Sequence, residues 1–166
     1  VYGYSQSRKA IWAGFFSLLI LVVSLTIAKH LPPASFWKNQ SAFDATLTKV
    51  PRIALASIIA YFSGEFVNSF VISKLKMRQK GKMMAIRFIA STVVGQAVDT
   101  FVFIAIAFTG LMSITDSIIL FFSAWSFKVI WEVIALPISL TIVRKLKKIE
   151  DEDHYDENTN YNPFKL

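Results

Sequence analysis

Long apolar runs, separated by short polar segments, dominate the hydrophobicity pattern of the chain. A helix needs about 20 such residues to cross a hydrocarbon core of roughly 30 Å. A soluble core helix would place polar residues on one face at every third or fourth position, whereas the first run has only small interruptions such as Ser17 and Ser24. We therefore predict an all-α, polytopic membrane protein with four spans, at about residues 11–28, 53–72, 88–108 and 117–143.

The composition agrees with a membrane protein and excludes several kinds of chemistry. Hydrophobic residues make up 54% of the chain and charged residues 17%, which is unusual for a soluble domain. There is no cysteine, so disulfides, thiol nucleophiles and thiolate metal sites are excluded. The two histidines, His30 and His154, lie outside the predicted spans, which excludes a histidine-based active site at membrane depth. We predict neither a metal nor a cofactor.

The distribution of basic residues predicts the topology. Residues 73–87, between the second and third spans, are rich in lysine and arginine, whereas residues 110–116 carry no base. The positive-inside rule places the first segment in the cytoplasm and the second outside, and alternation then places both chain ends inside. A nucleic-acid patch is the alternative explanation of the basic segment. Its position between two spans favours topology, and we predict no nucleic-acid partner.

The last residues differ in character from the rest. Glu150 to Glu157 contains six carboxylates in eight residues, and the polar sequence NTNYNPFKL follows. Acidic, polar composition is typical of solvated segments. We predict a membrane domain over residues 1–149 and a disordered, cytoplasmic tail over residues 150–166.

Four ionisable side chains lie inside the predicted spans: Glu65, Asp99, Lys128 and Glu132. On insertion scales, each charge near a helix centre costs roughly 2.5–3.5 kcal/mol. Each of the four lies near the middle of its span, so they are expected at one level in the bilayer. Transporters commonly place substrate and coupling-ion sites at this depth.

Other residues in the same spans support a polar layer. Asn68 follows Glu65 by three residues and Gln96 precedes Asp99 by three, so each amide shares a helix face with an acid. Small residues recur at four-residue spacing beside these acids, which allows helices to approach closely, and pure helix packing is the alternative explanation of that spacing. They are Ala56, Ala60 and Gly64 in the second span, and Ser91 and Gly95 in the third.

The fourth span leaves two questions open. Lys128 and Glu132 are four residues apart and can pair with each other, or Lys128 can bridge to Asp99 or Glu65 on another helix and leave one acid free for a ligand or a proton. Trp125 and Trp131 are too central for an interfacial belt. They can pack in the core or offer flat surfaces to a planar ligand.

Four stretches together resemble one family: VYGYSQSRKAIWAGF at 1–15, SGEFVNSFVISKLK at 63–76, STVVGQAVDTFVF at 91–103 and KVIWEVIALP at 128–137. The chain resembles the queuosine-precursor transporters, also called vitamin uptake transporters. The resemblance implies a bacterial inner-membrane importer of 7-deazaguanines, such as 7-cyano-7-deazaguanine or its 7-aminomethyl analogue, which serve tRNA modification. The family is expected to have about six spans, so two N-terminal helices are expected to be absent here.

The resemblance also implies roles for the polar residues. A carboxylate can accept two adjacent N–H groups of a guanine-like base, and an amide or lysine can donate to its exocyclic oxygen. Either tryptophan could stack on the ring. A buried acid without a cation tends to be protonated, so protons are the candidate coupling ion. The acids are Glu65, Asp99 and Glu132, the donors Asn68, Gln96 and Lys128, and the aromatic residues Trp125 and Trp131.

Three other functions are alternatives to transport. An intramembrane protease would need two paired aspartates, or a serine with a histidine in a span, and the spans hold only Asp99 and no histidine. A substrate-binding subunit with a separate energising partner remains open, and no phosphate-binding loop for ATP occurs in the chain. A structural subunit whose charges serve helix assembly is the third. Oligomeric state cannot be predicted from this sequence.

Overall fold

The computed structural model describes residues 1–165, apart from the side chains of residues 47–50. It contains four long helices: α1 (Gly3–His30), α2 (Gln40–Arg78), α3 (Met84–Phe108) and α4 (Ile114–Glu150). Each is long and apolar enough to cross a membrane, which confirms the all-α prediction with four spans. The helices extend beyond the predicted spans, because polar residues continue each helix past its apolar part.

Local hydrogen bonds explain where α2 ends and where α4 begins. α2 ends in a Schellman motif, in which Gly81 N donates to Lys76 O at 3.0 Å and Lys80 N donates to Met77 O at 3.2 Å. α4 begins at a reciprocal cap, because Ser113 Oγ accepts from Asp116 N at 3.1 Å and donates to the Asp116 carboxylate at 2.7 Å.

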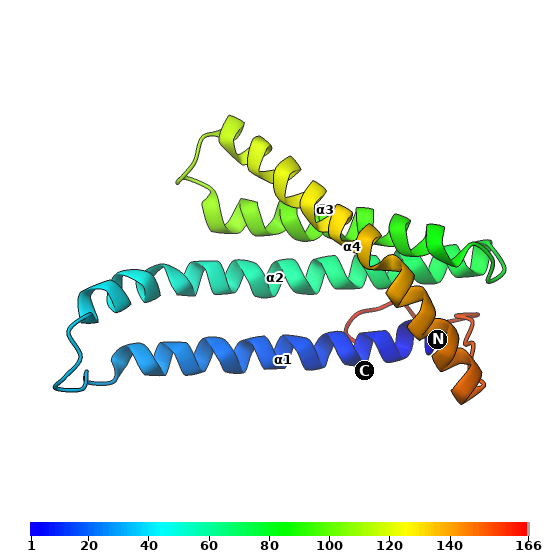
Figure 1. Cartoon of the computed structure of the whole chain (residues 1–166), viewed down its shortest axis with the longest axis horizontal. Helices are drawn as coiled ribbons and strands as arrows, with labels where there is room; N and C mark the ends of the chain where they lie inside the picture. The colour runs from blue at the N-terminus through cyan, green and yellow to red at the C-terminus, as the bar shows by residue number, and fades with distance from the viewer. Residues whose placement is uncertain (166) are drawn as a thin grey trace.

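The two ends of the helical bundle differ (Figure 1). We call the end with Val1, the α2–α3 turn and the C-terminal segment the tail end. The opposite end, with the connections at 31–39 and 109–113, is the loop end. Among the described residues, α2 packs against both α1 and α3, whereas α4 packs against α3 alone of the other three helices. The helices therefore form a row that is open between α2 and α4.

The small residues lie where α2 and α3 meet, as their spacing predicts. Ala56, Ala60 and Ser91 are each at most 1% exposed. A Cβ atom added to Gly64 would lie 2.6 Å from Asp99 Cβ, and one added to Gly95 would lie 2.7 Å from Asn68 Cβ. Only glycine fits at such a distance. This crossing fixes the relative positions of the polar residues of α2 and α3.

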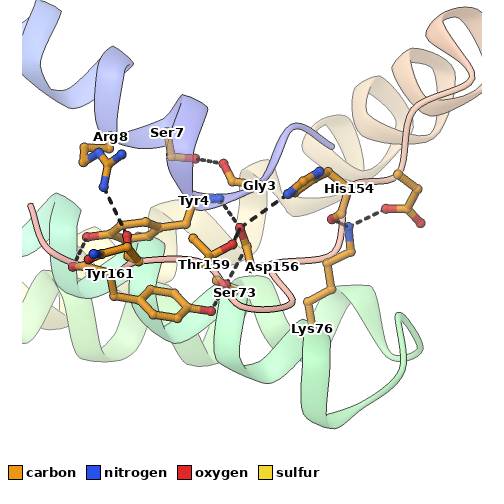
Figure 2. A network of polar contacts seen from close by, with 12 residues as sticks. Gly3, Tyr4, Ser7, Arg8, Ser73, Lys76, His154, Asp156, Thr159 and Tyr161 are labelled. Carbon is orange, nitrogen blue, oxygen red and sulfur yellow. Dashed lines mark hydrogen bonds and ion pairs between the residues drawn. The ribbon is translucent and has the colours of Figure 1, made fainter. Parts of the chain in front are cut away.

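The C-terminal segment lies against the bundle, whereas the sequence predicts a disordered tail. Residues 151–165 fold back along α1 and α2 (Figure 2). Acidic composition indicates a solvated segment only where the charges lack partners, and here Asp153 contacts both Lys76 and Lys147. Lys76 lies 77 residues before Asp153 in the sequence, so composition alone could not reveal that pairing.

Candidate functional site

A cavity of about 340 Å³ lies between α2, α3 and α4, and we call it the polar cavity. It holds seven of the eight residues that the sequence singled out as site candidates, together with two glycines. The acids are half-buried, and Trp131 lies at the rim with 64% of its surface exposed. The lining residues are Gly64, Glu65, Asn68, Gly95, Gln96, Asp99, Lys128, Trp131 and Glu132.

Lys128 forms an ion pair with Asp99 of the neighbouring helix. This contact answers the question about Lys128, which pairs with α3 and not with Glu132 of its own helix. Lysine before glutamate at four-residue spacing is the poorer orientation for a pair within one helix. Within the described residues, neither Glu65 nor Glu132 forms an ion pair. The cavity therefore offers two carboxylates that no base neutralises directly.

Asn68 contributes a polar atom without a partner. Its Oδ1 is buried and accepts no hydrogen bond from the described residues. A buried acceptor without a donor is unfavourable by roughly 1–3 kcal/mol, so such atoms often mark binding sites. Asn68 lines the polar cavity beside Glu65.

Trp125 lies away from the polar cavity. Its Nε1 donates to Val93 O at 3.0 Å, and its ring stacks on Phe121 at a centroid distance of 6.2 Å. It therefore joins α4 to α3, and its predicted place in the site is wrong. Trp125 and Trp131 are six residues apart, so they point about 120° apart on a helix. From this spacing, the sequence alone predicts that the two side chains face different sides of the helix.

A second cavity, of about 400 Å³, lies next to the polar cavity toward the loop end, and we call it the loop-end cavity. Asp99 and Lys128 line both cavities. The remainder of the loop-end cavity is mostly apolar, with Phe103 and Phe108 among its walls. Thr100 also lines it, and its Oγ1 is buried without a hydrogen-bond partner among the described residues. The ion pair thus stands at the boundary between a polar and an apolar compartment.

Two features of the structure are not predicted from the sequence: the contacts of the C-terminal segment with the bundle, and the position of Gly64 and Gly95 in the wall of the polar cavity. The glycines line the polar cavity because they bring the backbones of α2 and α3 together there. Their four-residue register with other small residues was the signal for this contact.

Comparison with known proteins identifies the family of the chain. A family model described as "putative vitamin uptake transporter" matches residues 1–142. A curated protein of Bacillus subtilis (strain 168), "Probable queuosine precursor transporter", is 31% identical over 137 residues. That similarity covers 82% of this chain and 60% of the relative, so the chain spans about 60% of the relative's length. No solved structure matches the chain.

Proposed function

Because the chain belongs to the vitamin uptake transporter family, we propose that it carries a queuosine precursor across the membrane. The substrate would be a 7-deazaguanine, either 7-cyano-7-deazaguanine or its 7-aminomethyl analogue. The proposal depends above all on the polar cavity, in which three membrane helices bring carboxylates, amides and a lysine together. Its volume of about 340 Å³ falls within the range of small-molecule sites.

The donors and acceptors of the cavity suit a flat, guanine-like base. Glu65 or Glu132, neither held by a base, can accept the paired N–H groups of the Watson–Crick edge. Gln96 or Lys128 can donate to the exocyclic oxygen. Trp131, exposed at the rim, can cover the ring. Asp99 is the least available acid, because Lys128 occupies it.

We propose that the tail end faces the cytoplasm of a bacterium and that the bilayer is its inner membrane. Basic residues gather at this end, and the loop-end connection at 109–113 has none. Substrate would then enter through the loop end and leave through the tail end. Protons are the proposed coupling ion. Equal uptake into vesicles with and without a proton gradient would contradict this coupling.

Binding of 7-cyano-7-deazaguanine to the full-length protein in detergent tests the function. A charge-assisted hydrogen bond is worth about 1.5–3 kcal/mol, so Glu65→Gln should weaken binding by roughly ten- to a hundredfold. Glu157→Gln, the same change in the exposed chain end, should bind as the parent does. Failure of the parent to bind any 7-deazaguanine would overturn the proposed substrate.

The same variant distinguishes transport from a purely structural role of the charges. If Glu65 serves helix assembly, Glu65→Gln should reduce the amount of folded protein. If it binds substrate, the variant should remain folded, with a normal elution profile and melting temperature, and should lose binding.

A further inference from the structure

A third cavity, of about 320 Å³, lies at the tail end of the bundle, and we call it the tail-end cavity. All four helices and the C-terminal segment contribute to its walls. Along α2 it begins directly after the polar cavity, since Asn68 lines the polar cavity and Ser69 the tail-end cavity. The residues of α3 and α4 that line it also lie closer to the tail end than those that line the polar cavity, so the tail-end cavity lies between the polar cavity and the tail end of the bundle.

Asp156 of the C-terminal segment forms part of the wall and is only 5% exposed. Its carboxylate accepts from Tyr4 N at 2.9 Å and from Ser73 Oγ at 2.6 Å. It thereby caps the first turn of α1 and connects it to α2, as Figure 2 shows. This buried carboxylate anchors the segment.

A second set of anchors holds the end of the segment along α1. Arg8 is 7% exposed and donates to the carbonyl oxygens of Asn160 at 3.1 Å and Asn162 at 2.9 Å. Trp12 Nε1 donates to Pro163 O at 2.9 Å. The Tyr161 ring lies between aromatic residues of α1 and α2, so residues 156–164 are held by both polar and apolar contacts.

Asp153 makes a different kind of contact, because it bridges two helices that do not pack together. Its Oδ1 lies 2.5 Å from Lys76 Nζ of α2 and 2.6 Å from Lys147 Nζ of α4. Both lysines line the tail-end cavity. The Asp153 side chain is 39% exposed, whereas Lys76 and Lys147 are 12% and 19% exposed, and contact of the carboxylate with water weakens such ion pairs. The segment thus has a firmly anchored part and a releasable bridge beside the opening between α2 and α4.

We propose that residues 151–165 form a latch: Asp153 holds α2 and α4 together over the tail-end cavity, and its release lets substrate leave the polar cavity at this end. The inference rests on the proposed transport function. The row arrangement of the helices supports it, since α4 has no packing contact with α2 to resist their separation once the bridge opens.

Reversible cross-linking tests the latch. The chain has no native cysteine, so a thiol-specific cross-linker reacts only with the introduced cysteines. Lys76→Cys and Lys147→Cys, joined by a short bifunctional thiosulfonate, replace the ionic bridge by a covalent one. In the full-length protein, the joined form should bind 7-cyano-7-deazaguanine normally but transport it at least tenfold more slowly, and reduction should restore the rate. Unchanged transport after complete cross-linking would overturn the latch. Absence of binding in both forms would instead contradict the proposed function.

Opening the latch gives the converse measurement. Ser69→Cys places a thiol in the wall of the tail-end cavity, where a water-soluble maleimide reports access. Asp153→Asn should raise the labelling rate several-fold, whereas the matched change Glu157→Gln should leave it unchanged. Equal labelling in the two variants would show that Asp153 does not close this cavity. Melting temperatures of both variants, measured in parallel, separate loss of the latch from general unfolding.

Discussion

Lys128 of α4 forms an ion pair with Asp99 of α3, and both residues line the polar cavity as well as the loop-end cavity. A charge pair at such a boundary has two consequences. It joins α4 to α3 beside the hydrogen bond from Trp125 to Val93, and it separates a compartment of polar side chains from one lined by phenylalanine. The same two residues therefore contribute to assembly and to the path through the protein.

The pair should be energetically coupled. Lys128→Met leaves the half-buried Asp99 carboxylate without its base and should destabilise the protein, whereas Lys128→Met combined with Asp99→Asn removes both charges and should recover much of the loss. A coupling free energy of roughly 0.5–3 kcal/mol is expected for residues in contact. Thermal unfolding of the two single variants and the double variant in detergent measures it. Additive effects would show that the ion pair contributes nothing to stability.

The close contact of α2 and α3 at Gly64 and Gly95 should not tolerate an added methyl group. Gly95→Ala places a Cβ 2.7 Å from Asn68 Cβ, so α2 and α3 must separate. The polar cavity depends on that crossing, and we expect affinity for 7-cyano-7-deazaguanine to fall at least tenfold. Val94→Ala, at a 42% exposed neighbouring position of the same helix, is the control and should bind normally. Equal affinity of the two variants would show that the site tolerates a wider helix spacing.

The site residues that could be predicted from the sequence are those whose charge is energetically costly inside an apolar span. Charges are expensive within an apolar span, so Glu65, Asp99, Lys128 and Glu132 stood out and their shared depth followed from helix geometry. The partner of Lys128 could not be chosen, because Glu132 lay within reach along the helix and Asp99 only after folding. The contacts of the C-terminal segment could not be predicted for the same reason, because Asp153 and Lys76 are 77 residues apart and meet only after folding.

The topology can be measured with cysteines introduced into the cysteine-free chain. Leu111→Cys lies at the loop end in a 68% exposed position, and Glu157→Cys lies in the segment at the tail end. In intact cells, a membrane-impermeant maleimide should label Leu111→Cys and spare Glu157→Cys until the membrane is broken. The opposite order would reverse the proposed orientation and the direction of exit through the tail-end cavity.

The latch should withstand mild acid, and the reason lies in the ionisation of Asp153. Partial burial opposes its ionisation, but hydrogen bonds from Lys147 and Lys76 outweigh burial and hold the pKa of the carboxyl below its ordinary value. A group with a lowered folded pKa stabilises the docked state fully above its ordinary pKa, and the stabilisation is lost as pH falls through the lowered value.

A spin label on Glu152→Cys, an exposed position next to Asp153 and outside the firmly anchored part of the segment, makes that stability measurable. Its mobility should stay constant from pH 8 to pH 5 and rise only below about pH 4, where aspartate begins to protonate. The same label combined with Asp153→Asn should be more mobile throughout the range, because the bridge to Lys76 and Lys147 is missing at every pH. A transition between pH 5 and pH 7 in the parent would contradict control by Asp153, since its carboxylate is already ionised there and its contacts cannot change with pH.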